Sequence, residues 1–236
     1  MNIFFVDWNN MTPQYSYPLI HSLLNRKKYI FYFITNTTPL DEKTFSIYEI
    51  NKLDNFLSFP YQILNKLFKP FVLFINYCIL LKKINSLKPQ ILHFNWLSFP
   101  IIDLFFIFIF KFLNIKIFIT HHNHYQHSKN NFRFGEFFIF NCADKIICLS
   151  EFVKNQFNST FHKKINVIPH RNSYEHLLQK RGRNKNKYVS LLLIGNIKKY
   201  KGVDFLIDVM KNFKLNNYPI HLKIIGLGNQ SYIKFL

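Results

Sequence analysis

The stretch VSLLLIG at residues 189–195, followed by NIKKYKG at residues 196–202, decides the fold that we expect for this chain. An apolar run that ends at a glycine is typical of a strand buried on both faces, and apolar residues at helical spacing follow it from Val203 to Met210. A second apolar run ends in IIGLG at Gly228. This pattern predicts a strand, a basic loop, a helix and a second, parallel strand.

The sequence stops at Leu236, soon after this unit. A parallel α/β domain needs several such units to cover both faces of its sheet. We therefore expect residues 188–236 to be the first part of a second Rossmann-like domain, and the chain to be truncated at its C-terminus.

Apolar runs also alternate with amphipathic segments upstream. We predict strands at residues 2–7, 29–35, 90–94, 115–120, 145–150 and 165–169, helices at 13–25, 57–87, 100–113, 132–141 and 152–157, and an irregular segment at 37–54. This alternation predicts a Rossmann-like, doubly wound parallel sheet in an N-terminal domain at residues 1–170. The basic run KRGRNKNK then indicates a linker at residues 171–187.

The charge of the chain points to anionic partners. Its 31 Lys and Arg residues outnumber 12 Asp and Glu residues, for a net charge of +19, which favours phosphorylated ligands or an anionic membrane surface. No nucleic-acid-binding motif accompanies the charge, so we expect no nucleic-acid partner. The three cysteines form no CxxC pair and the N-terminus carries no signal-peptide pattern, which predicts a cytoplasmic location.

Two windows, residues 71–81 and 101–113, are the most hydrophobic of the chain. Both are shorter than the roughly 20 residues that a membrane-spanning helix needs. We expect buried helices there. An exposed aromatic face, flanked by lysines and resting on the inner face of the plasma membrane, is the alternative.

Polar residues gather where the predicted strands end. Ligands of open α/β sheets bind beyond the carboxyl ends of the strands, so these side chains are expected to face one crevice. They are His93, Asn95 and Trp96 after one strand, His121, His122, Asn123, His124 and His127 after the next, Ser150 and Glu151 after the third, and His170 and Arg171 after the last. The histidine loop HHNHYQH has no fixed carboxylate or cysteine nearby, so we expect it to bind sugar hydroxyls or phosphate and no metal ion.

The basic loop of the second domain carries Lys198, Lys199 and Lys201 just before a predicted helix. A helix N-terminus attracts anions through its backbone N–H groups, and nearby ammonium groups add charge. We expect a phosphate or diphosphate at this loop.

Five strings, in order along the chain, resemble family 4 (group 1) glycosyltransferases of the GT-B fold. They are ILHFNWLSFP at 91–100, ITHHNHYQH at 119–127, ADKIICLSEFVKNQF at 143–157, INVIPHRNSY at 165–174 and GNIKKYKGVDFLI at 195–207. The last is similar to the start of the family's C-terminal domain. The resemblance covers nearly the whole chain and is densest from Ile91 to Gly228.

The resemblance implies transfer of a sugar, with retention at the anomeric carbon, from a nucleotide sugar to a lipid-linked or polysaccharide acceptor in bacterial surface-glycan synthesis. It implies no cofactor besides the donor. The expected site residues are His122 as the catalytic residue; Asn123, Lys198, Lys201, Gly195 and Glu151 on the donor side; and His93, Asn95, Trp96 and His127 on the acceptor side.

The chain also departs from the family pattern. Asn196 stands where many relatives have Arg, Arg171 replaces a Gly, and the first loop, residues 7–13, has no Gly. The family's C-terminal E-x7-E element would lie beyond Leu236, so we expect this chain by itself to be inactive. A non-catalytic module that binds a membrane surface and a nucleotide-sugar epimerase of the same fold are the alternatives.

Overall fold

The computed structural model describes residues 1–8, 13–24, 29–35, 51–53, 65–122, 135–169, 189–216 and 218–235. They belong to two compact units, Met1–Leu177 and Leu178–Leu236. The predicted linker at residues 171–187 lies outside the described residues.

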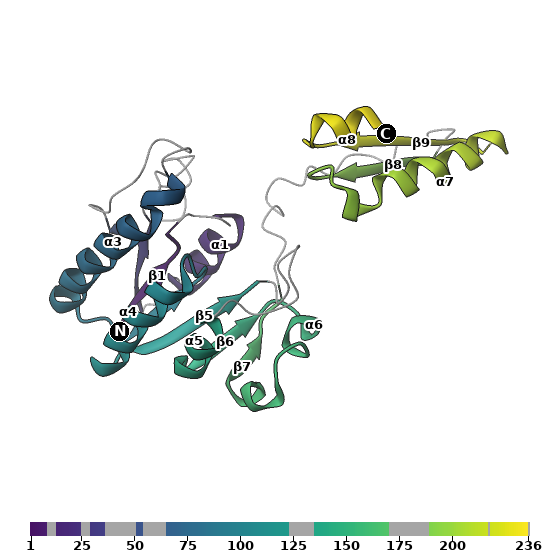
Figure 1. Cartoon of the computed structure of the whole chain (residues 1–236). Coiled ribbons are helices and arrows are strands. Elements are labelled where there is room, and N and C mark those ends of the chain that lie inside the picture. Colours follow the sequence, from purple (N-terminus) through teal and green to yellow (C-terminus); the bar gives the residue numbers. More distant parts are fainter. Residues whose placement is uncertain are drawn as a thin grey trace. The chain divides into compact units, whose positions relative to one another are not determined.

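The first unit is built around a sheet of seven parallel strands in the order β3-β2-β1-β4-β5-β6-β7 (Figure 1). The strands are β1 (Asn2–Val6), β2 (Ile30–Ile34), β3 (Asn51–Leu53), β4 (Ile91–Phe94), β5 (Lys116–His121), β6 (Lys145–Cys148) and β7 (Ile165–Val167). From β1 the chain first builds the sheet outward in one direction and then, from β4, in the other. This topology confirms the predicted doubly wound sheet, with its switch point between β1 and β4.

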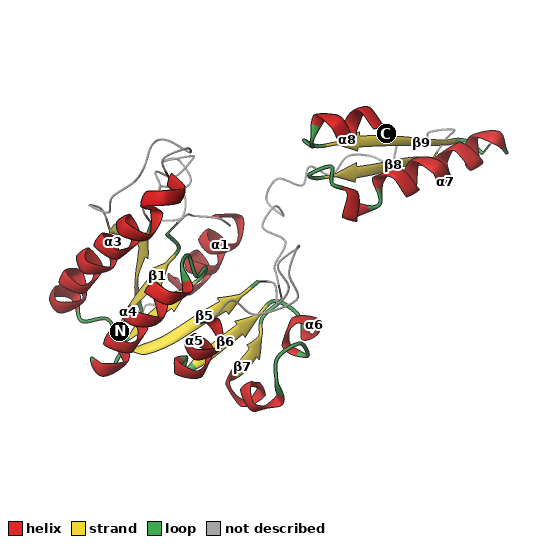
Figure 2. Cartoon of the chain, viewed as in Figure 1, coloured by secondary structure: helices red, strands yellow, loops and turns green. Residues whose placement is uncertain are grey.

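Helices connect these strands (Figure 2). They are α1 (Pro13–Leu24), α3 (Asn65–Leu87), α4 (Pro100–Phe112), α5 (Glu136–Cys142) and α6 (Glu151–Lys154), and a 3-10 helix, η1 (Ser159–Lys164), precedes β7. Helices α3 and α4 are followed by Lys88 and Asn114, which have left-handed φ angles of 45° and 58°. Left-handed residues at these positions end a helix, and Pro89 also prevents α3 from continuing.

Side chains of the central strands β1, β2 and β4 alternate between two hydrophobic clusters. On β1, Phe4 and Val6 enter the larger cluster, with residues of α3, α4 and α5, whereas Ile3 and Phe5 enter a smaller one with Ile20 of α1. The sheet is therefore covered on both faces, as expected of parallel strands with near-continuous apolar sequences.

Two elements differ from the prediction. The segment 37–54, predicted to be irregular, contains the edge strand β3, whose pairing with β2 starts at Asn51 opposite Tyr32. Helix α3 (Asn65–Leu87) lies within the predicted helix at 57–87 and is continuous over 23 residues, with Pro70 in its second turn. It is longer than the apolar window at 71–81, from which we expected a length too short to span a membrane. Among the described helices, its part Phe68–Leu87 is long and apolar enough to cross a membrane by length and composition alone.

Asp103 is a buried carboxylate between α3 and α4. Its Oδ1 accepts a hydrogen bond of 2.7 Å from the Tyr77 hydroxyl, and its Oδ2 accepts bonds of 2.8 Å from the backbone N–H groups of Ser98 and Phe99. These two N–H groups lie at the start of α4, so the carboxylate caps the helix from the core side. Burial raises the pKa of Asp103 to about 7, although these donors oppose the rise.

The second unit contains β8 (Val189–Ile194), a 3-10 turn, η3 (Lys199–Lys201), α7 (Val203–Leu215), β9 (Ile220–Ile225) and α8 (Gln230–Phe235). The two strands pair in parallel from Val189 opposite Ile220 to Ile194 opposite Ile225. The strand, loop, helix, strand order predicted from residues 189–228 is confirmed.

Candidate functional site

The carboxyl ends of β1, β4 and β5 bring polar side chains together in the first unit. Asp7 follows β1, Asn95 follows β4 and His122 follows β5. Because β1 and β4 flank the topological switch point, this edge of the sheet is where ligands of doubly wound folds bind.

A hydrogen-bonded network links these strand ends below the surface. The Asn95 amide Nδ2 donates to the Asp7 carboxylate at 2.9 Å and to the Ser16 hydroxyl oxygen at 3.0 Å, and Ser16 donates to Asp7 at 3.3 Å. All three residues are fully buried. Since a carboxylate only accepts hydrogen bonds, Asp7 fixes the orientation of the Asn95 amide.

His122 is held by this network on one side and by a ring on the other. Its Nε2 lies 3.0 Å from Asn95 Oδ1, and its ring stacks on the Trp96 ring with centroids 4.1 Å apart and planes 2° apart. The ring of Tyr15 contacts it edge-on at 5.4 Å. Because Asn95 Oδ1 is an acceptor, the neutral imidazole carries its proton on Nε2. The half-buried His122 thus has a fixed position and a fixed tautomer at the sheet edge.

His93 is placed differently from the prediction. It lies within β4 rather than after it, is 7% exposed, and its Nε2 lies 2.8 Å from the Thr120 hydroxyl. The rings of Phe5 and Phe118 pack against it. Burial, aided by nearby His122, lowers the pKa of His93 to about 3, so it stays neutral. The alternation of the strand turns this side chain into the core, not toward the strand-end edge.

Glu151 opens helix α6 beyond β6. Ser150 caps this helix, since its hydroxyl oxygen accepts a 3.2 Å bond from the Val153 N–H. The exposed Glu151 carboxylate lies 3.1 Å from the Lys154 ammonium. Asn123 and His127, also predicted site residues, lie outside the described residues. Within the part of the chain that the structure describes, no three His, Cys, Asp or Glu residues gather as a metal site would require.

In the second unit the two loops that follow β8 and β9 run in close contact. Gly195 and Ile197 donate backbone hydrogen bonds to the carbonyl oxygens of Ile225 and Leu227, at 2.9 and 2.7 Å. A Cβ atom at Gly226 would lie only 1.8 Å from the Gly195 carbonyl oxygen. Glycine is therefore required at position 226 for the two loops to meet.

Lys201 folds back toward the first of these loops. A Cβ atom at Gly195 would lie 3.0 Å from the Lys201 Nζ, so the ammonium group lies beside the backbone at the end of β8. Gly202, with a left-handed φ of 63°, then caps helix α7. The predicted residues Gly195 and Lys201 thus lie together, next to the N-terminus of a helix.

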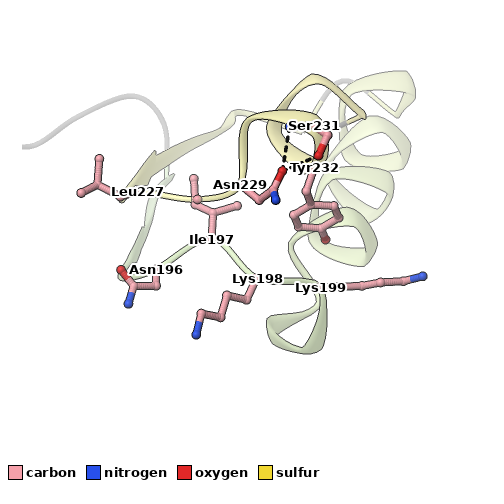
Figure 3. Close-up of a pocket in the computed structure, with 9 residues that line it drawn as sticks. Asn196, Ile197, Lys198, Lys199, Leu227, Asn229, Ser231 and Tyr232 are labelled. Atoms are coloured by element: carbon pink, nitrogen blue, oxygen red, sulfur yellow. Dashed lines mark hydrogen bonds between the residues drawn. The ribbon is translucent and has the colours of Figure 1, made fainter. Parts of the chain in front are cut away.

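The same loops form a pocket of about 630 Å³ (Figure 3). It is lined by Asn196, Ile197, Lys198, Lys199, Leu227, Gly228, Asn229, Ser231 and Tyr232. In Figure 3, the Lys198 and Asn196 side chains point to one side of the loop, while Lys199 extends away from them. The Lys198 ammonium also lies 6.0 Å from the centre of the Tyr200 ring. A basic side chain and several polar groups therefore surround a cavity large enough for a nucleotide-sized ligand.

Replacing Gly226 with alanine should destabilise the second unit by about 2 kcal/mol or more, because the added methyl group forces the two loops apart. Chemical denaturation followed by amide hydrogen exchange of β8 would measure this loss. Replacing Ser231 with alanine, which removes an exposed side-chain contact of the same pocket, is the matched control and should change the stability by less than about 1 kcal/mol. Equal stability of the two variants would contradict the close contact of the loops.

Several residues of these sites were not predicted from the sequence. Asp7 and Ser16 hold Asn95, and Asn229, Ser231 and Tyr232 line the pocket of the second unit. Asp7 is the last residue of the predicted strand at 2–7, so the rule that ligands bind at the carboxyl ends of strands also points to it. The other four residues carry no signal in their local sequence.

Comparison with known proteins agrees with this architecture. Residues 21–170 match the model of Glycosyltransferase Family 4. Over 86 residues, the chain is 35% identical to an uncharacterized glycosyltransferase of Methanocaldococcus jannaschii, a match that covers 36% of this chain and 22% of that protein. The chain thus spans about a fifth of the length of this relative.

Solved structures share the fold at low sequence identity. The apo lipopolysaccharide outer core galactosyltransferase WaaB is 17% identical with a TM-score of 0.62, over 99% of this chain and 63% of that one. The Anabaena protein HepE in complex with UDP-glucose is 14% identical with a TM-score of 0.61, over 100% and 64%. The UDP-GlcNAc 2-epimerase of Neisseria meningitidis is 12% identical with a TM-score of 0.57, over 100% and 74%.

These structures are built from Rossmann-like domains of the GT-B fold, and the parallel sheets with alternating helices of this chain match such domains. The fold is common to transferases and an epimerase and does not separate them. The family match does, because it covers most of the first unit and includes the strand ends that carry Asn95 and His122. The chain belongs to glycosyltransferase family 4.

Proposed function

We propose that this protein is a retaining, nucleotide-sugar-dependent glycosyltransferase that transfers a sugar to a lipid-linked or polysaccharide acceptor in bacterial surface-glycan synthesis. The observation that carries the proposal is the position of Lys201 beside Gly195, at the N-terminus of α7 and next to a pocket that Lys198 lines. The membership of the chain in glycosyltransferase family 4 supports it.

The basic loop suits the diphosphate of the donor. Breaking the bond between the sugar and the diphosphate builds negative charge on the leaving group, and fixed cations in a preorganised site stabilise that charge. Lys201 and Lys198 supply two cations, and the backbone N–H groups at the start of α7 add partial positive charge. In this proposal, the pocket between the two loops receives the nucleoside.

His122 suits contact with the donor sugar. Its proton lies on Nε2, toward Asn95, and its ring plane is set by the stack on Trp96. A histidine held in this way presents one defined orientation to a hydroxyl group of a sugar, which favours a single bound geometry of the reacting carbon. We propose that Asn95 and Asp7 position His122 and do not contact the sugar.

The nucleotide is the first point to test. UDP is the probe of choice because the structurally similar protein HepE has a crystal structure in complex with UDP-glucose. Isothermal titration of this chain with UDP and with uridine should show that the diphosphate strengthens binding. If UDP bound no more tightly than uridine, the proposed diphosphate site would be wrong.

Replacing Lys201 with alanine should weaken UDP binding by about tenfold to a hundredfold, since a charge-assisted contact to the diphosphate is lost, and should leave uridine binding unchanged. Replacing Lys211 with alanine removes the same charge from an exposed position on α7, where Lys211 pairs with Asp208, and serves as the control. An equal loss in both variants would indicate a general effect of charge and contradict a local role of Lys201.

Two alternatives predict other outcomes. A nucleotide-sugar epimerase, as in the Neisseria meningitidis neighbour, would convert the donor without any acceptor, and the sugar product would show it. A non-catalytic binding module would bind UDP or a membrane without turnover. Nucleotide binding tests the proposed diphosphate site directly and does not depend on turnover.

A further inference from the structure

Helix α4 carries large apolar residues on both its inner and its outer face. Its inner face places Phe106, Ile107 and Phe110 in the core. Its outer face, at the spacing i, i+4, i+7 and i+11, consists of Ile101, Phe105, Phe108 and Phe112. Phe105 and Phe108 are each 54% exposed, and Phe112 is 87% exposed. A helix that faces water normally carries polar residues at such positions, so this outer face is made for an apolar environment.

The neighbouring helices extend this surface. Helices α3 and α5 both contact α4. Helix α3 adds the exposed rings of Phe68, Phe71 and Phe74, and α5 adds Phe137 and Phe138. The ring of Phe74 on α3 contacts the ring of the buried Phe106 on α4 at 5.3 Å, so these two helices meet beside the exposed rings. We call the exposed apolar residues of α3, α4 and α5 the aromatic face. Exposed apolar side chains gathered on neighbouring helices are typical of sites of interaction with a protein or a membrane.

The charge around the aromatic face is mostly positive. Residues 65–113 contain six lysines and one acidic residue, Asp103, which is buried. On the side of α5, Glu136 opens the helix and Asp144 pairs with Lys111. Lys82 and Lys88 are exposed near the C-terminal end of α3, and the exposed Lys116 starts the adjoining strand. Lysines beside exposed aromatic rings are complementary to a surface that is apolar inside and anionic at its rim.

We propose that the aromatic face rests on an anionic lipid bilayer, with the rings among the acyl chains and the lysines at the lipid phosphates. Helix α3 then lies along the membrane and does not cross it, although its length and composition would allow a crossing. Leu73, Tyr77 and Leu80 of α3 are buried against the sheet, and a crossing helix would remove them from that core. The inference goes beyond the proposed function, because the surface binds membrane whether or not sugar is transferred.

Sedimentation with lipid vesicles tests this surface without donor or acceptor. The chain should bind vesicles of phosphatidylcholine mixed with phosphatidylglycerol, and binding should weaken at high salt and with phosphatidylcholine alone. Replacing Phe105, Phe108 and Phe112 together with serine should lower the partition coefficient by about tenfold or more. Replacing Lys82 and Lys88 with glutamine should lower it about tenfold on anionic vesicles only.

The matched control is Phe152→Ser, because Phe152 is 72% exposed on α6, outside the aromatic face. This variant should bind vesicles as the parent does. Circular dichroism and thermal unfolding would establish that each variant is folded. Unchanged vesicle binding of the folded triple variant would overturn the proposal. The proposal would also be overturned if, without lipid, the parent chain formed a dimer and the triple variant were a monomer. The aromatic face would then be covered by a second copy of the chain.

A second experiment uses tryptophan fluorescence to detect insertion of the aromatic face into lipid. In the variant Phe108→Trp, the new indole should shift its emission to shorter wavelength on addition of anionic vesicles, and brominated lipids should quench it. If the protein sediments with the vesicles but the emission of the new indole does not change, the membrane contact lies elsewhere on the protein and the proposal is overturned. Failure of these experiments leaves UDP binding at the second unit untouched, so the two proposals fail separately.

Discussion

Replacing Asn95 with alanine should lower the free energy of unfolding of the first unit by about 3 kcal/mol. The Asn95 side chain is fully buried, and its amide donates to the carboxylate of Asp7 and to Ser16. The variant leaves Asp7, a fully buried carboxylate, with one hydrogen-bond donor fewer. Urea denaturation monitored by circular dichroism would measure the loss.

An exposed asparagine supplies the matched control for this change. Asn141 lies on α5 and donates to the Phe137 carbonyl oxygen at 3.1 Å. Its replacement by alanine should change the stability by no more than about 0.5 kcal/mol. If both variants lost the same stability, the strand-end network would not be the source of the effect.

The same variant reports on His122. Without the Asn95 carbonyl oxygen, His122 should leave its stack on Trp96. The fluorescence of Trp96 should then rise, because we expect the stacked imidazole to quench it. In a His122→Ala background, the Asn95→Ala change should cause no further rise, because Asn95 acts on Trp96 only through His122. A rise of equal size in both backgrounds would contradict the role of Asn95 in positioning the histidine.

The sheet could be predicted from the sequence because its strands are buried on both faces. Runs such as Phe4 to Val6 and Ile117 to Ile119 are apolar throughout, and helical spacing follows them. The edge strand β3 could not be predicted in this way. Its three residues, Asn51–Leu53, carry too little pattern, and their conformation depends on pairing with β2, which is distant in the sequence.

The candidate site was predicted only in part, for a similar physical reason. The rule that ligands bind beyond strand ends located Asn95, Trp96 and His122 correctly at one edge. It placed His93 there too, because the exact last residue of a strand decides whether a side chain faces the core or the edge. Contacts between distant segments, such as Asp7 with Asn95, or Gly195 with Gly226, arise from the folded chain and leave no local pattern.

Two buried groups should give the first unit opposite pH dependences. The pKa of His93 falls from 6.5 to about 3 on folding, so its stabilising effect is complete above pH 6.5 and is lost as the pH falls toward 3. The pKa of Asp103 rises from 3.8 to about 7, so its stabilising effect is complete below pH 3.8 and is lost as the pH rises toward 7. Between pH 3.8 and pH 6.5 the two groups therefore change the free energy of unfolding with opposite slopes, each about 1.4 kcal/mol per pH unit, and these slopes cancel in the parent protein.

Single replacements should therefore separate the two slopes. Between about pH 4.5 and about pH 6.5, acidification should stabilise His93→Gln and destabilise Asp103→Asn, each relative to the parent, by about 1.4 kcal/mol per pH unit. Both replacements can keep a hydrogen bond, glutamine with Thr120 and asparagine with Tyr77. Urea denaturation at several pH values would measure the slopes.

Asp144 provides the control for these slopes. It pairs with Lys111 at 2.8 Å, and its hydrogen bonds with Lys111 and Ile117 outweigh its partial burial and lower the pKa of its carboxyl group. A lowered carboxyl pKa affects stability only at more acidic pH, so Asp144→Asn should leave the slope between about pH 4.5 and about pH 6.5 as in the parent. Parallel curves for His93→Gln and Asp103→Asn would show that the core does not hold these two groups neutral. Curves that diverge by about 3 kcal/mol per pH unit are expected, because the two slopes have opposite signs.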